Sequence, residues 1–205
     1  MNVGIYIYNE VEVLDFAGPY EVFTTAARVR AKQEPNAVKL FEVFLIAERE
    51  GEVHARANFQ VKPHYTIQNH PEVDVLVVPG GVHTAELEKP RVIEWIAGLA
   101  PKTNLTASVC TGAFLLAKAG ILQDKSCTTH WEDILELRAM FPTLDVKEDV
   151  AWVDNGRIVT SAGISAGIEM ALHLVAKLAG KELAVKTARQ MQYTWNNEHL
   201  SQENE

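Results

Sequence analysis

The chain has 205 residues, of which 47% are apolar and 22% charged, the composition of one globular domain. Its formal net charge of -8 opposes binding to nucleic acid, and no cluster of Lys and Arg counteracts that charge. The longest apolar runs, such as residues 75–79, are far too short to span a bilayer, and the first residues lack the basic start of a secretory signal. We therefore expect a cytoplasmic protein that binds neither nucleic acid nor membrane.

The predicted elements alternate between strands and helices along the chain. In chain order they are a strand at 3–8, a helix at 15–30, a strand at 40–47, a hairpin at 51–63, a strand at 73–78, a helix at 90–99, a strand at 105–109, helices at 113–119 and 130–141, a hairpin of strands 150–154 and 158–161, and helices at 165–178 and 181–193. The nearly unbroken Val and Leu run at 73–78 is typical of a central strand covered by helices on both faces. Asn155-Gly156 predicts the tight turn of the second hairpin.

This alternation predicts an α/β fold, with a mainly parallel central sheet and helices on both faces. No linker or internal repeat interrupts it, so we expect one domain over residues 1–195 and a polar C-terminal tail at 196–205. Ligands of such sheets bind at the carboxyl ends of the strands. Three segments, at 14–15, 79–81 and 110–112, are expected to meet there.

Cys110 is the strongest candidate for chemistry. A strand leads directly into Cys110-Thr111-Gly112, which is the pattern of a nucleophile elbow at a sharp strand-to-helix turn. The amino end of the following helix is expected to lower the pKa of the thiol. Backbone N–H groups of Gly81 and Thr111 are the predicted donors to developing negative charge. The other cysteine, Cys127, is interpreted as a buried apolar residue, and neither cysteine lies in a metal-binding pattern.

Asp15 has two interpretations. It could cap its helix, or its carboxyl could lie beside Cys110, favour the protonated form, and donate a hydrogen bond or shuttle a proton. His130 could be a base, a ligand contact or only the first residue of a helix. With Gly80 and Ile164, it completes the expected substrate pocket.

Four segments together resemble the ThiJ/PfpI superfamily: residues 14–23 (LDFAGPYEVF), 78–81 (VPGG), 110–112 (CTG) and 128–131 (TTHW). The resemblance covers nearly all of the chain in order. Within the superfamily the chain is most similar to isocyanide hydratases and to the amidotransferase-like sensor domains of AraC-type transcription regulators. The resemblance implies a flavodoxin-like three-layer sandwich of the class I glutamine amidotransferase type. It also implies a homodimer and a strained backbone at the cysteine.

The same resemblance assigns roles to individual residues. It implies that Cys110 is the nucleophile, that Asp15 hydrogen-bonds to it, and that Thr111 is the residue following the nucleophile in hydratases. Many members carry Glu at the acid position, and Asp matches the isocyanide hydratase branch. The protease-like branch has His where this chain has Thr111, so peptidase activity is not expected.

Three functions remain open at this point. The first is hydration of a small isocyanide to an N-formamide through a thioimidate on Cys110, with no metal or organic cofactor. The second is a non-enzymatic role in ligand or redox sensing, which we expect less because no DNA-binding domain follows before Glu205. The third is glyoxalase-like action on 2-oxoaldehydes.

Overall fold

Seven strands form a central sheet, and its carboxyl edge carries the candidate site. The computed structural model describes residues 1–196. The sheet strands are β1 (Asn2–Tyr6), β2 (Glu42–Ala47), β5 (Tyr65–Thr66), β6 (Val75–Val78), β7 (Leu105–Val109), β10 (Trp152–Asp154) and β11 (Ile158–Ser161). Their order is β10-β11-β7-β6-β1-β2-β5, and every neighbouring pair is parallel except β10 with β11.

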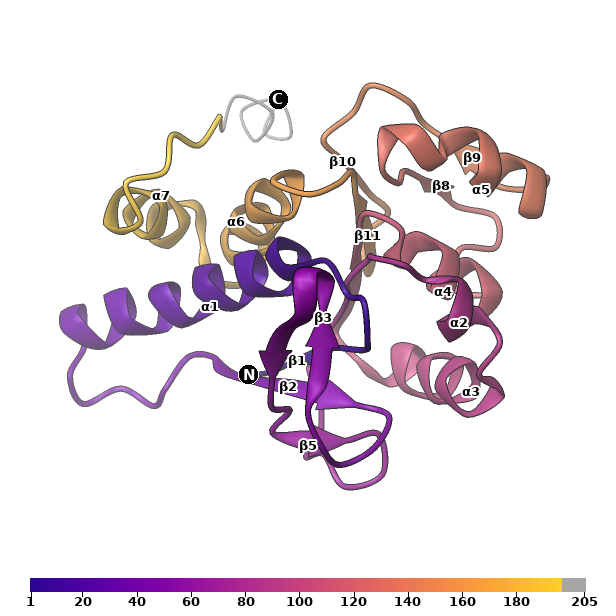
Figure 1. Ribbon diagram of the computed structural model, residues 1–205. Coiled ribbons are helices and arrows are strands. Elements are labelled where there is room, and N and C mark those ends of the chain that lie inside the picture. The colour runs from indigo at the N-terminus through magenta and orange to yellow at the C-terminus, as the bar shows by residue number, and fades with distance from the viewer. Residues whose placement is uncertain (197–205) are drawn as a thin grey trace.

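Helices cover both faces of this sheet (Figure 1). One face carries α1 (Val13–Gln33), α6 (Ala166–Ala179) and α7 (Lys181–Gln190), and the other carries α2 (Thr84–Leu87), α3 (Pro90–Leu99) and α4 (Gly112–Lys118). The small two-stranded sheet of β8 (Ser126–Cys127) and β9 (Asp145–Val146) lies with α5 (Ile134–Met140) beyond β10. The hairpin of β3 (Val53–Ala55) and β4 (Phe59–Val61) is antiparallel. The predicted α/β sandwich is confirmed.

The central strands form the core because both of their faces are covered. All four residues of β6 are completely buried, as the continuous apolar run predicted. Burial of each such side chain stabilises the fold by about 1.5–3 kcal/mol. No described helix combines the length and apolarity needed to cross a bilayer.

The structure corrects two predicted helix starts. Helix α1 begins two residues before Asp15, and its N-cap is Glu12, whose carboxylate accepts a hydrogen bond from the Val13 N–H. Asp15 is thus in the first turn and is not the cap. The helix predicted from residue 130 begins with a 3₁₀ turn at Trp131–Asp133, because His130 is extended with a ψ of 142°.

The short elements β5, α2, β8 and β9 were not predicted. Each has only two to four residues, too few for a periodic pattern to emerge. The predicted tail falls almost wholly outside the described residues.

The start of α4 packs directly against the end of β6. A Cβ atom added to Gly112 would overlap the Val78 carbonyl group. We expect Gly112→Ala to lower the free energy of unfolding by about 1–3 kcal/mol, because the backbone must shift to admit the methyl group. Urea unfolding measures this change.

The matched control is Gly98→Ala in α3, where an added Cβ meets no heavy atom within 4 Å. This exposed helical site should gain about 0.5–1 kcal/mol. Equal stability of Gly112→Ala and wild type would contradict the close approach of α4 to β6.

Candidate active site

Cys110 occupies a strained turn between β7 and α4. Its φ is 56°, in the left-handed region that non-glycine residues rarely adopt, as the resemblance implied. Two hydrogen bonds hold this backbone: the Cys110 N–H donates to the Ser161 carbonyl at 3.1 Å, and the Thr129 hydroxyl donates to the Cys110 carbonyl at 2.9 Å. The side chain is only 7% exposed.

Two glycines from neighbouring strand ends leave room for the cysteine. A Cβ on Gly163, after β11, would lie 2.9 Å from the Cys110 sulfur. A Cβ on Gly80, after β6, would lie 2.9 Å from the Cys110 Cβ. The backbone after both adjacent strands therefore approaches the Cys110 side chain. Larger residues at positions 80 and 163 would displace that side chain.

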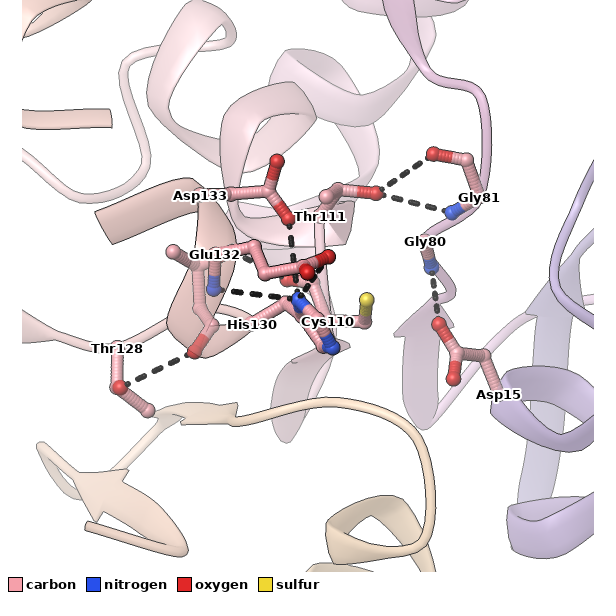
Figure 2. A network of polar contacts seen from close by, with 10 residues as sticks. Asp15, Gly80, Gly81, Cys110, Thr111, Thr128, His130, Glu132 and Asp133 are labelled. Atoms are coloured by element: carbon pink, nitrogen blue, oxygen red, sulfur yellow. Dashed lines mark hydrogen bonds and ion pairs between the residues drawn. The ribbon is translucent and has the colours of Figure 1, made fainter. Parts of the chain in front are cut away.

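Asp15 is completely buried, and Figure 2 shows it to the right of the cysteine, next to Gly80. Its Oδ2 accepts a hydrogen bond from the Gly80 N–H at 3.1 Å, and its Oδ1 has no hydrogen-bond partner within the described part of the chain. Burial raises the pKa of Asp15 to about 7, although the Gly80 N–H acts to lower it. The pKa of Asp15 is thus shifted in the predicted direction, toward the protonated form, and the main cause is desolvation.

The pKa of the Cys110 thiol is raised, contrary to the prediction. Burial is the largest cause, and the negative charge of Asp15 adds to it. The Thr111 N–H at the start of α4 acts to lower the pKa but does not outweigh these two effects. The thiol is therefore protonated at neutral pH, where Asp15, with a pKa of about 7, is divided between its protonated and ionised forms.

Thr111 connects the loops that follow β6 and β7. Its hydroxyl accepts a hydrogen bond from the Gly81 N–H at 2.9 Å and donates one to the Gly81 carbonyl at 3.0 Å (Figure 2). The Gly81 N–H is thus already bonded. This leaves the Thr111 N–H as the backbone donor that acts on the sulfur.

His130 lies on the other side of the cysteine. Its Nδ1 is 3.4 Å from Asp133 Oδ2 and 3.4 Å from the Glu132 backbone nitrogen. Figure 2 shows the ring beside Cys110. An added Cβ on Gly163 would contact both the ring and the sulfur, so the two side chains flank the same backbone atom.

A pocket of about 380 Å³ opens above the thiol. Of the predicted site residues, its lining includes Gly81, Cys110, Thr111, His130 and Ile164. Gly80 was predicted to line the pocket, but it is buried and instead holds Asp15 through its N–H.

Seven lining residues were not predicted, and five of them are ionisable: Glu12, Arg56, His83, Glu132 and Asp133. The three-residue spacing between His130 and Asp133 could have suggested their pairing. Arg56 comes from the β3–β4 hairpin, and nothing in the sequence places that hairpin over the site. In the described residues, no three His, Cys, Asp or Glu side chains are grouped so as to hold a metal ion.

The fold and this site define an α/β protein with a cysteine at a strand-to-helix elbow and a buried carboxyl beside it. The chain belongs to the DJ-1/PfpI family, whose model matches residues 1–177.

Relatives within the family have different roles. The chain is 33% identical to an isonitrile hydratase of Pseudomonas putida, over 94% of this chain and 78% of that protein. It is 24% identical to the HTH-type transcriptional regulator GbdR of Pseudomonas aeruginosa, over 94% of this chain but only half of the regulator. The crystal structure of Drosophila melanogaster DJ-1beta shares the fold, with a TM-score of 0.78 at 21% identity, covering 95% of this chain and 98% of that chain.

The raised pKa of Asp15 makes the stability of the fold depend on pH. Below about pH 4 the carboxyl is protonated in both the folded and the unfolded chain. Between about pH 4 and 7 the unfolded chain loses this proton while the folded chain keeps it, so stability falls as pH rises. We expect Asp15→Asn to be more stable than wild type by up to roughly 4 kcal/mol near pH 8, and by much less near pH 5. Urea unfolding at both pH values measures the difference.

Asp154 provides a control, because its pKa is shifted in the opposite direction from that of Asp15. Burial acts to raise its pKa, but hydrogen bonds from His173 and Lys177 outweigh burial and lower it to about 2. Its carboxylate contributes stability above about pH 4, so Asp154→Asn should be less stable than wild type at both pH values. A pH-independent effect of Asp15→Asn would show that the carboxyl is not desolvated.

Proposed function

We propose that this protein hydrates a small isocyanide (isonitrile) to the corresponding N-formamide, with Cys110 as nucleophile. The observation that carries the proposal is the buried Asp15, with a pKa near 7, next to a protonated thiol at the base of a pocket. A base of that strength is matched to proton transfer at neutral pH. The similarity to isonitrile hydratase supports the choice of substrate.

The first half-reaction needs no preformed thiolate. The Asp15 carboxylate takes the thiol proton as the sulfur attacks the terminal isocyanide carbon. The resulting carboxylic acid then delivers this proton to the same carbon. The product is a thioimidate, R–N=CH–S, attached to Cys110, and Asp15 is again a carboxylate. The Thr111 N–H stabilises negative charge on the sulfur during the attack.

The second half-reaction adds water to the thioimidate carbon. One water proton goes to the imidate nitrogen, which gives the tetrahedral species R–NH–CH(OH)–S. The carbon–sulfur bond then breaks, the hydroxyl proton returns to the sulfur through Asp15, and the formamide leaves. One isocyanide and one water are consumed, and the protein regains its starting state.

Redox sensing receives less support from the site. Sensor cysteines are exposed and have lowered pKa values, because the thiolate is the form that is oxidised. Cys110 is buried and its pKa is raised. The similarity to transcription regulators extends over only about half of their length. It therefore does not support the activity of those whole proteins for this chain. A homodimer is part of the proposal on the family resemblance alone.

Replacement of the nucleophile is the direct test. Cys110→Ser should abolish formamide production from benzyl isocyanide, because the hydroxyl is a far weaker nucleophile at this site. The control Cys127→Ala removes the other cysteine, which is buried in β8, and should retain activity. Formamide is quantified by chromatography. Equal rates for wild type and Cys110→Ser would eliminate this mechanism, and consumption of methylglyoxal instead would favour the glyoxalase alternative.

Asp15→Asn should separate thiol reactivity from catalysis. The substitution removes the negative charge that raises the pKa of Cys110, so alkylation by iodoacetamide at about pH 8 should become faster. Hydration of isocyanide should nevertheless slow by about 10²–10⁴-fold, because the proton carrier is lost. A variant in which both rates rise together would show that Asp15 transfers no proton.

A further inference from the structure

The peptide group between Pro79 and Gly80 is hydrogen-bonded at both ends. Its N–H, which belongs to Gly80, donates to Asp15 Oδ2 at 3.1 Å (Figure 2). Its C=O, which belongs to Pro79, accepts a hydrogen bond from the Tyr8 hydroxyl at 3.3 Å. The C=O and N–H of a planar trans peptide point in opposite directions. Tyr8 and Asp15 therefore hold one peptide group from its two sides.

The Tyr8 hydroxyl is fixed by the packing of its ring. Tyr8 follows β1, and its side chain is only 3% exposed. The ring stacks on that of Tyr6, with ring centroids 5.7 Å apart. The Tyr6 ring is itself held, because its hydroxyl donates to Glu86 Oε2 at 2.6 Å. The stack of two rings thus sets where the Tyr8 hydroxyl meets the Pro79 carbonyl.

This hydroxyl keeps its proton at any pH at which the protein works. Burial is the largest cause of the raised pKa of Tyr8, and the negative charges of Glu86, Asp15 and Cys110 add to it. A protonated tyrosine hydroxyl is a hydrogen-bond donor. Tyr8 can therefore donate to the Pro79 carbonyl both below and above the pKa of Asp15.

A purely structural role for Tyr8 is the alternative. Buried tyrosines commonly find a partner for the hydroxyl, and 3.3 Å is longer than the usual ~2.8 Å for such a bond. In that role the hydroxyl would only satisfy a buried carbonyl. The shared peptide group argues for more, because hydrogen bonds that follow one another through a peptide polarise each other. The two roles differ in what loss of the hydroxyl does to Asp15.

We infer that Tyr8 is a positioning residue for the proton carrier: its hydroxyl orients and polarises the Pro79–Gly80 peptide so that the N–H is held toward Asp15. The consequence of this contact for catalysis rests on the proposed function. Tyr8 is not among the residues that line the pocket above the thiol, so it acts through the peptide and not on the substrate.

The other groups that act on the Asp15 carboxyl are independent of Tyr8. The charge of Glu12 raises the pKa of Asp15, and a hydrogen bond from the Cys110 thiol lowers it. Loss of the Tyr8 hydroxyl should leave both effects in place and weaken only the hydrogen bond from Gly80. Because that bond favours the carboxylate, the pKa of Asp15 should rise.

Tyr8→Phe removes the hydroxyl and keeps the ring. The midpoint of the Asp15 titration should move up by roughly 0.5 pH unit, because the carboxylate is less well stabilised. NMR measures this midpoint in the full chain without substrate, since the Gly80 amide proton resonance shifts as its acceptor ionises. The pH profile of formamide production from benzyl isocyanide should move in the same direction, because the carboxylate is the form that accepts the thiol proton.

Tyr6→Phe is the matched control. It removes a buried hydroxyl from the adjacent ring of the same stack but leaves the bond from Tyr8 to Pro79 in place. Its Asp15 midpoint should equal that of wild type. A second variant carries 3-fluorotyrosine at position 8, which keeps the hydroxyl and makes it a stronger donor. In that variant the midpoint should move down.

The outcomes separate this inference from the proposed function. An Asp15 midpoint that is unchanged in Tyr8→Phe, or that moves equally in Tyr6→Phe, overturns the inference whatever the activity of the protein. If Tyr8→Phe does not fold, the fluorotyrosine variant decides, and an unchanged or higher midpoint overturns the inference. A midpoint that rises only in Tyr8→Phe supports it. That support holds even if the wild type makes no formamide, a result that overturns the proposed function alone.

Discussion

Two weak acids are buried side by side at the carboxyl edge of the sheet, and the chemistry of the site follows from this contact. Water is largely excluded from Asp15 and Cys110, so each charged form is destabilised. The carboxyl, with a pKa of about 7, is the stronger acid of the two and is the one that carries the negative charge when a proton is lost. Burial and that charge together keep the proton on the sulfur. In the proposed mechanism the nucleophile and its proton carrier are therefore one coupled unit.

The fold provides this unit at a cost to its own stability. The left-handed backbone of Cys110 and the desolvated carboxylate are both unfavourable, and the buried strands on either side stabilise the fold against them. Glycines at 80 and 163 let the backbone approach the Cys110 side chain, and Gly112 lets the start of α4 approach the end of β6. The Thr111 hydroxyl fixes the distance between two of these segments through Gly81.

The features that the sequence could predict are those that depend on continuous local patterns. The β6 run, the turn after β7 and the order of strands and helices were visible, and they place Cys110 and Asp15 at one edge. The sign of the thiol pKa was not predictable, because it depends on how deeply the elbow is buried by β11 and α1. Asp133, Glu12 and Arg56 were missed for a similar reason: tertiary packing brings their loops to the pocket.

The charges around the pocket entrance have a consequence for which molecules reach the thiol. Three carboxyl groups, from Glu12, Glu132 and Asp133, share this lining with a single cation, Arg56. Clefts lined mainly by one sign of charge concentrate ions of the opposite sign and exclude those of the same sign. Most small metabolites of a cell are anions, including its organic acids and phosphate esters. The net negative lining is therefore expected to disfavour anions at the cysteine and to favour uncharged, apolar molecules.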